Sequence, residues 1–283
     1  MNGLTAEQWK VFVKTVGQKP EERVSELLND GYVVLFGETD YDPKLGKSMG
    51  LVGTTNDDII TLNATNDALI INLLSGLKSG KRRLYLDINA SAQPQIDEFL
   101  RTGNEEVFNL VTSHLERIAQ GATNKEMKGK SARRLSRGYF NLLRSAHEYN
   151  VEVICLGNPE KHNPKRNDDT MMADTNYAAN NITSPGIVYL PAEWVKKKDY
   201  CSIPKGLTGR GIINYAFLHE IDANQFGSLT QGFTAHIQTL VNGRIAFDLS
   251  DIRVSSLIEN KAVCREYDGI VYTRQLANTS RQQ

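Results

Sequence analysis

The side chains best suited to chemistry in this chain are carboxylates that directly follow apolar runs. Residues 32–36 (YVVLF) lead, after one glycine, into three acids: Glu38, Asp40 and Asp42. Consecutive apolar residues are typical of a parallel strand that is covered on both faces. Ligands bind outside the carboxyl ends of strands in open α/β sheets, so these acids are site candidates. A solvated turn that is opened by Gly37 and closed by Pro43 is the alternative.

Three later apolar runs also end in polar side chains. LYLDINAS (residues 84–91) carries Asp87 and Asn89, and VEVICLGNP (151–159) leads into a polar loop with Arg166, Asn167 and Asp168. GIVYLPAEW (186–194) reads as a fourth strand that is closed by Pro191 and leads to Glu193. Because the carboxyl ends of parallel strands meet at one edge of a sheet, we expect these side chains to share that edge. Strand ends are polar in most α/β proteins, which is the alternative explanation.

Carboxylates that converge in this way have two chemical uses. They bind a hard cation such as Mg²⁺, Mn²⁺ or Ca²⁺ through oxygen, for which the candidates are Asp40, Asp87 and Glu193. Alternatively, one carboxyl is held protonated and serves as general acid beside an ionised base. In a hydrolase, Glu38 or Asp40 would activate water, Glu193 would assist, and Arg166, Asn167 and Asn89 would hold the substrate.

Composition excludes several other classes of protein. Lys plus Arg and Asp plus Glu both number 33, so the chain lacks the basic field expected of a nucleic-acid binder. Three scattered cysteines without CxxC spacing argue against a disulfide scaffold or a cysteine zinc site. We find no GxGxxG, GxxxxGK[ST] or GxSxG motif, no signal-peptide pattern, and no apolar run near about 18 residues. A cytoplasmic location without a membrane span is expected.

Helical patterns alternate with the apolar runs. Helices are expected from Thr5 to Val16 with Trp9, Val11 and Phe12 on the apolar stripe, from Pro20 to Gly31, and over residues 66–80, 93–103, 104–121, 131–150 and 166–182. Residues 43–63 resemble a glycine-dotted loop, and further strands are expected within 211–222, 243–252 and 267–273. His147 lies in a helical segment, where a structural role is expected. The alternation predicts one α/β domain with a mainly parallel sheet and helices on both faces.

The order of these segments resembles a superfamily that contains the Tiki metalloproteases, ChaN-like haem-uptake proteins, TraB-like proteins and erythromycin esterases. A strand that leads into G-E-x-H corresponds to Gly37-Glu38-Thr39-Asp40, and a Q-P segment follows the second strand at Gln93. An R-[ND]-x-x-M-A helix corresponds to residues 166–173, and the second G-x-x-H falls within GIVYLPAEW. The resemblance covers residues 31–195, preceded by a helical segment (1–30) and followed by strands and helices that complete the sheet (196–283).

The resemblance implies a site whose usual ligands have changed. The two motif histidines of the family correspond to Asp40 (or Tyr41 at the longer esterase spacing) and to Glu193. Carboxylates favour Mg²⁺, Mn²⁺ or Ca²⁺ over zinc or iron. The first hypothesis is therefore an accessory, catalytically degenerate domain of a bacterial toxin or effector, within a larger multidomain protein or delivered into a host cytosol, that binds a small molecule or a protein. The second is an esterase-like or peptidase-like hydrolase.

Overall fold

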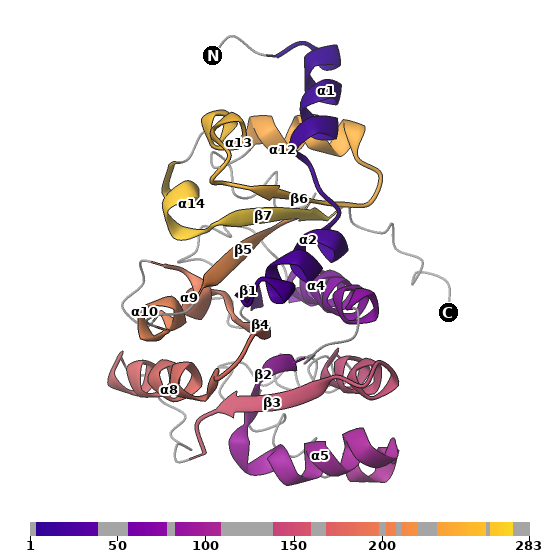
Figure 1. Ribbon diagram of the computed structural model, residues 1–283, viewed down its shortest axis with the longest axis vertical. Helices are drawn as coiled ribbons and strands as arrows, with labels where there is room; N and C mark the ends of the chain where they lie inside the picture. The colour runs from indigo at the N-terminus through magenta and orange to yellow at the C-terminus, as the bar shows by residue number, and fades with distance from the viewer. Residues whose placement is uncertain are drawn as a thin grey trace.

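Seven strands form one sheet in the order β3-β2-β4-β1-β5-β7-β6 (Figure 1). The strands are β1 (Val33–Glu38), β2 (Arg83–Asn89), β3 (Glu152–Gly157), β4 (Gly186–Pro191), β5 (Ile212–His219), β6 (Arg244–Asp248) and β7 (Gly269–Thr273). Neighbouring strands are parallel except β6, which is antiparallel to β7. The predicted α/β fold with a mainly parallel sheet is confirmed.

These elements come from a computed structural model. It describes residues 4–38, 56–77, 83–108, 138–159, 168–197, 202–207, 211–219, 231–258 and 261–273.

One face of the sheet, called the α4 face, is covered by α2 (Pro20–Asn29), α4 (Asn56–Gly76), α5 (Gln93–Thr102) and the helical residues 138–148. Val34 and Phe36 of β1 point to this face, where they join the largest apolar cluster. The leucines and isoleucines of α4 that recur every three or four residues complete it, Leu69, Ile70, Leu73 and Leu74, together with Leu77 just beyond the helix.

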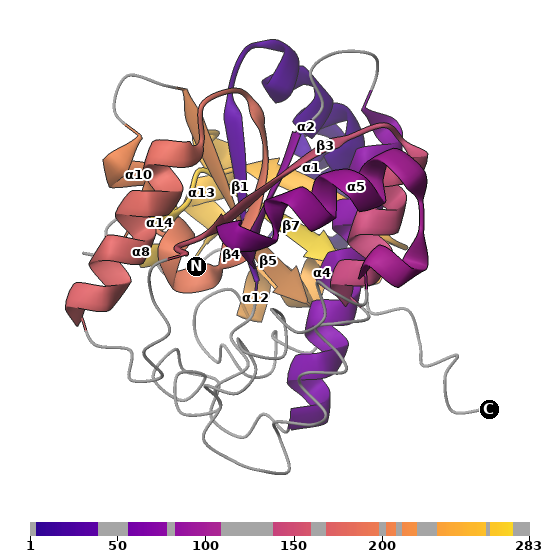
Figure 2. The ribbon, with the colours of Figure 1, turned by 90° about the horizontal axis from the view of Figure 1, so that it is seen from below.

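The opposite face, called the α8 face, is covered by α8 (Asp168–Asn181), α9 (Ala192–Val195) and α10 (Ile203–Gly206). Val33 and Leu35, which alternate with the residues of the α4 face, join this second cluster. Figure 2 shows the helices of the two faces on opposite sides of the strands. A third cluster packs α1 (Ala6–Val16), α12 (Gln231–Leu240) and α13 (Ile252–Leu257) on β6 and β7, and α14 (Lys261–Glu266) precedes β7.

The first helices follow from local sequence. Thr5 and Gln8 form a reciprocal capping box at the start of α1, and Pro20 occupies the first turn of α2. Trp9 and Val16 are buried as expected, whereas Val11 is 63% exposed. The predicted stripe is therefore wrong at Val11, because only part of the α1 surface rests on α12 and β6.

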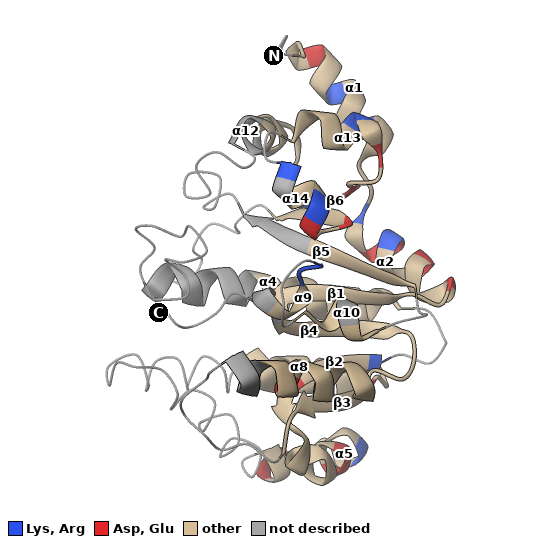
Figure 3. Ribbon diagram, turned by 90° about the vertical axis from the view of Figure 1, so that its left-hand side faces the viewer, with Lys and Arg blue, Asp and Glu red and all other residues tan. Residues whose placement is uncertain are grey.

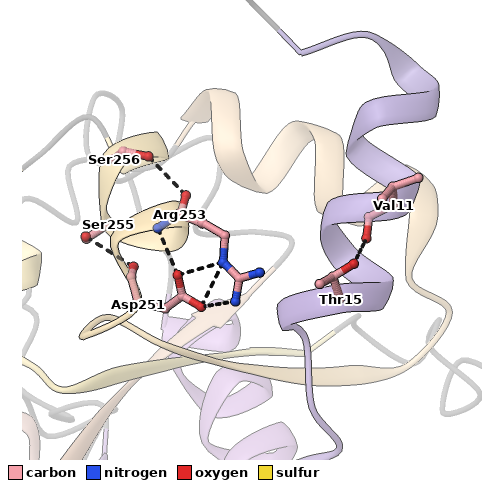
Figure 4. Close-up of polar contacts among 6 residues, drawn as sticks. All are labelled: Val11, Thr15, Asp251, Arg253, Ser255 and Ser256. Atoms are coloured by element: carbon pink, nitrogen blue, oxygen red, sulfur yellow. Dashed lines mark hydrogen bonds and ion pairs between the residues drawn. The ribbon is translucent and has the colours of Figure 1, made fainter.

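Helix α13 begins with the same kind of local signal. The carboxylate of Asp251 accepts a hydrogen bond from the backbone N–H of Arg253 at 2.9 Å and from its guanidinium Nη2 at 2.6 Å (Figure 4). These bonds lower the pKa of Asp251, with the side-chain bond from Arg253 as the largest cause. Figure 3 marks the positions of charged residues along the ribbon, for example on α2 and α5.

Both outer strands have their edges covered. The Gln93 side chain donates to the carbonyl oxygen of Val153 at 2.8 Å and accepts from the N–H of Cys155 at 2.8 Å, as a neighbouring strand would. On the other edge, Gln18 and Ala246 exchange two backbone hydrogen bonds of 2.9 and 2.8 Å. These contacts satisfy edge groups that would otherwise be free to pair with another chain.

One expected boundary is confirmed and one is wrong. The strand expected in 186–194 ends at Pro191 as predicted, and residues 192–195 are helical, because proline has no N–H to continue the ladder. Residues 56–63, which were expected in a loop, form the first part of α4 instead. That part carries only Ile59, Ile60 and Leu62 among polar residues, so its helical pattern is weaker in the sequence than that of the second half of the helix.

Candidate functional site

The connections after β1 and β4 leave the sheet on opposite faces. The chain leaves β1 for α4 on the α4 face, whereas β4 leads into α9 on the α8 face. The order of strands requires this, because right-handed crossovers toward β3 and away from it must use opposite faces. We call the carboxyl ends of these two paired strands, residues 37–38 and 190–193, the β1–β4 switch point. Open α/β sheets bind their ligands at such places.

The structure brings two predicted site residues to this point. Glu38 is the last residue of β1 and is in register with Pro191 of the neighbouring strand. Glu193 follows two residues later in α9, which packs against both β4 and β1. Neighbouring strands lie about 4.8 Å apart. The backbone therefore places both acidic positions at the same part of the carboxyl edge.

Asp87 and Asn89 lie at the same carboxyl edge but on the α8 face of the sheet. Leu86 is in register with Tyr189, so the end of β2 lies beside the end of β4. The alternation of β2 places Asp87 and Asn89 on the face of Tyr85, the α8 face. Position 38, by contrast, shares the α4 face with Phe36.

Asn89 already has structural partners. Its Oδ1 accepts hydrogen bonds from the backbone N–H of Ser91 at 2.9 Å and from the Ser91 hydroxyl at 2.6 Å. Its Nδ2 donates to the carbonyl oxygen of Asn158 at 3.4 Å. Asn89 thereby caps the short helix η1 (Ala90–Ala92) and connects it to the end of β3.

The remaining predicted site residues lie outside the described residues: Asp40, Tyr41, Arg166 and Asn167. Within the described ranges, no group of three or more His, Cys, Asp or Glu side chains is arranged to hold a metal ion. The three-residue metal set that includes Asp40 therefore stays a prediction.

Asn66 on α4 is a polar side chain that the sequence patterns did not single out. It precedes Leu69 and Ile70 by three and four residues, so it occupies the stripe that faces the sheet, and it is only 1% exposed. Neither its Nδ2 nor its Oδ1 has a hydrogen-bond partner within the described part of the chain. A polar residue on an otherwise apolar stripe is the sequence signal that would have identified it.

The next residue, Asp67, contacts the sheet. The hydroxyl of Tyr189 on β4 donates a buried hydrogen bond to Asp67 Oδ1 at 3.1 Å. Phe36 is in register with Tyr189 and stacks on Tyr215 of β5, with ring centroids 5.6 Å apart. The sheet beneath α4 therefore presents aromatic rings and one buried carboxylate.

Two other candidate reactive groups on the α4 face are held protonated. Burial, with the nearby Asp248 carboxylate, raises the pKa of Tyr215, whose hydroxyl donates to Asp248 Oδ1 at 3.2 Å. Burial also raises the pKa of the Cys155 thiol to about 12. Thiolate is the nucleophilic form of cysteine, so Cys155 is inert at neutral pH. His147 is also structural, as predicted, because its Nδ1 lies 2.6 Å from the carbonyl oxygen of Leu100.

Comparisons with known proteins give structural neighbours but no family. No family model matches the chain, and no curated protein matches it. A solved protein from Bacillus cereus, Q81BN2_BACCR, aligns over 96% of this chain and 98% of its own, with 9% identity and a TM-score of 0.46. A structure described as bacterial protein toxins aligns over 77% of this chain and 40% of its own, with 14% identity and a TM-score of 0.41. At these scores neither likeness bears on activity.

One further finding concerns membranes. Among the described helices, none combines the length and the apolar character that a membrane crossing needs.

Proposed function

We propose that this chain is a binding domain that receives a polar ligand at the β1–β4 switch point and does not catalyse a reaction there. The resemblance of residues 31–195 to the Tiki and ChaN superfamily supports a derivation from that scaffold. Within that proposal, the domain forms part of a larger bacterial toxin or effector. Loss of both motif histidines supports binding rather than the metal chemistry of the family.

A single observation carries this proposal. Glu38 is the last residue of β1 and is in register with Pro191 of β4. Glu193 lies in α9, where the connection after β4 leaves for the α8 face. Because the two connections leave to opposite faces of the sheet, no single helix covers both strand ends, and open α/β proteins bind their ligands at this carboxyl edge. Two acidic positions at that place suit a ligand that offers hydroxyl, amide or ammonium donors.

Native mass spectrometry tests this function with a desalted bacterial small-molecule extract as the probe. We expect the full chain to retain one bound species after equilibration and buffer exchange. The double substitution Glu38→Gln with Glu193→Gln should remove that species. The matched control is Glu22→Gln with Glu26→Gln, two acids on the outer surface of α2, which should retain it. A wild-type chain without any bound species would contradict the proposal.

The same geometry supports one alternative, a divalent-cation hydrolase. In that version Glu38 or Asp40 activates water and Glu193 binds the cation. Position 38 lies on the α4 face, whereas Asp87 and α9 lie on the α8 face, so the ligands of such an ion would have to meet around the carboxyl edge of the sheet. First-shell oxygens must lie about 2.0–2.6 Å from such an ion.

Thermal unfolding with Mg²⁺, Mn²⁺, Ca²⁺ or Zn²⁺ separates the two functions. An ion at about a hundred times its dissociation constant adds about 2.7 kcal/mol to the free energy of unfolding. The hydrolase alternative predicts this gain, its loss in Asp40→Ala or Glu193→Ala, and activity on ester or peptide substrates. The binding-domain proposal predicts no gain with any ion and no turnover.

A further inference from the structure

We propose that Asn66 binds the ligand beneath the β1–β4 switch point, and that the ligand carries an uncharged planar group with an N–H donor beside a C=O acceptor. This inference rests on the proposed function, because it assigns a ligand class to the same end of the sheet. It adds a binding residue on α4 to the two acidic positions on β1 and α9.

The amide of Asn66 differs from the other buried asparagine of the core. Asn214 on β5 is fully buried, and its Nδ2 donates to the carbonyl oxygens of Val195 at 2.6 Å and Glu266 at 2.8 Å. Its Oδ1 accepts from the N–H of Asp268 at 2.9 Å. Asn66 is equally buried, yet the described residues supply no partner for its donor or its acceptor. Buried polar groups in native proteins are almost always paired, so this amide calls for a partner beyond the described residues, and a bound ligand supplies one.

The place of Asn66 in the fold links it to the switch point. The β1–α4–β2 crossover runs α4 from the carboxyl edge of the sheet back to the start of β2 at Arg83. Asn66 therefore lies on the carboxyl-edge side of the contact between Asp67 and Tyr189. Because Asn66 is buried, a ligand that enters at the carboxyl edge must displace the side chains around this amide to reach it.

The groups around Asn66 limit the chemical class of ligand that can bind there. A side-chain amide offers a donor and an acceptor in one plane, which a cyclic amide or a pyrimidine edge matches with two hydrogen bonds. The adjacent Asp67 carboxylate repels an anionic ligand. The rings of Phe36 and Tyr189, level on neighbouring strands, suit a flat and weakly polar body. An uncharged heterocycle or lactam meets all three conditions.

The first experiment compares the two asparagines by thermal unfolding of the free protein. Asn66→Leu removes two unpaired polar atoms from an apolar stripe, so we expect a higher Tm. Asn214→Leu removes the three side-chain hydrogen bonds to Val195, Glu266 and Asp268 from the core, so we expect a lower Tm. A fall in Tm for Asn66→Leu comparable to that for Asn214→Leu would show that Asn66 is paired within the fold and would overturn the inference.

The second experiment measures binding with named probes by ligand-observed NMR titration: uracil, 2-pyrrolidinone and 1,3-dimethyluracil. We expect uracil or 2-pyrrolidinone to bind the wild-type chain about tenfold or more tightly than Asn66→Leu, since each tenfold corresponds to about 1.4 kcal/mol. The two probes distinguish a nucleobase-like ligand from a simple lactam. The dimethylated ring, which lacks the N–H donor, should not bind.

Absence of binding by both donor-bearing probes, or equal affinity for Asn66→Leu, overturns the ligand assignment. These results are distinguishable from failure of the proposed function. A species from the small-molecule extract that depends on Glu38 and Glu193 but not on Asn66 would retain the switch point as a binding site and remove Asn66 from it.

Discussion

At the residue scale, close packing at single positions explains several glycines of the sheet. A Cβ on Gly269, the first residue of β7, would lie 2.1 Å from a ring carbon of Tyr215 on the paired strand. The Tyr215 ring has little room to move, because it is buried, stacks on Phe36 and donates to Asp248. Glycine at this position is therefore a steric requirement of the β5–β7 pair.

We expect Gly269→Ala to lower the free energy of unfolding by about 1–3 kcal/mol, as overpacking of a core typically does. The matched control is Gly76→Ala at the end of α4, where a Cβ would meet only the Glu21 side chain at 3.4 Å. Alanine favours a helix over glycine by up to about 1 kcal/mol, so the control should be neutral or stabilising. Urea denaturation measures both variants. Similar values for the two would contradict the steric explanation.

At the element scale, the side chain of Gln93 makes the hydrogen bonds that a neighbouring strand would make at one edge of the sheet. Gln93, at the start of α5, hydrogen-bonds two backbone groups of β3 that face away from β2. The following helix then extends along this edge, as Figure 1 shows. The sequence resemblance marked Gln93 only as part of a motif, and the hydrogen bonds give it a physical role.

Gln93→Ala should leave the carbonyl of Val153 and the N–H of Cys155 without partners. The expected loss is about 1–3 kcal/mol of unfolding free energy, together with faster hydrogen exchange of the Cys155 amide. Asp97→Ala is the control, because Asp97 also accepts from Gln93 Nε2 at 2.8 Å but is exposed and lies on α5 itself. If both variants lose the same stability, the edge contact is not the cause.

At the scale of the whole molecule, the buried thiol of Cys155 makes global stability depend on pH. Its pKa is about 12 in the folded chain, whereas an unfolded cysteine ionises near about 8.5. Above that value the unfolded state binds fewer protons than the folded state, so the free energy of unfolding falls as pH rises. Below about pH 8 this thiol contributes no pH dependence.

Comparison of the wild-type chain with Cys155→Ala at pH 8 and pH 10 isolates this effect. The wild-type chain should lose about 1–2 kcal/mol more unfolding free energy over that interval than the variant, since one pH unit corresponds to at most about 1.4 kcal/mol for one group. Tyr215 also has a raised pKa, but both chains retain it and its contribution cancels. Parallel pH profiles for the two chains would contradict the assignment.

The sequence alone determined the order and class of the elements. Apolar runs marked all seven strands, and the capping signals at Thr5 and Pro20 placed the first two helices, because these are local preferences of the backbone. It also identified the strand ends where Glu38, Asp87, Asn89 and Glu193 lie as the candidate site. The β6 strand proved shorter than its predicted window, since residues 249–251 turn into the cap of α13.

Only the tertiary structure decided which of these residues meet. The insertion of β4 between β1 and β2 places Glu38 beside Pro191, and this depends on long-range strand pairing that leaves no local signal. The alternation of β1 and β2 then assigns position 38 and Asp87 to opposite faces, which separates them although both follow apolar runs. The same packing buries Asn66 with no partner among the described residues and Asn214 with three, although both are asparagines. Burial and partners arise from distant segments, so this difference exists only in the folded chain.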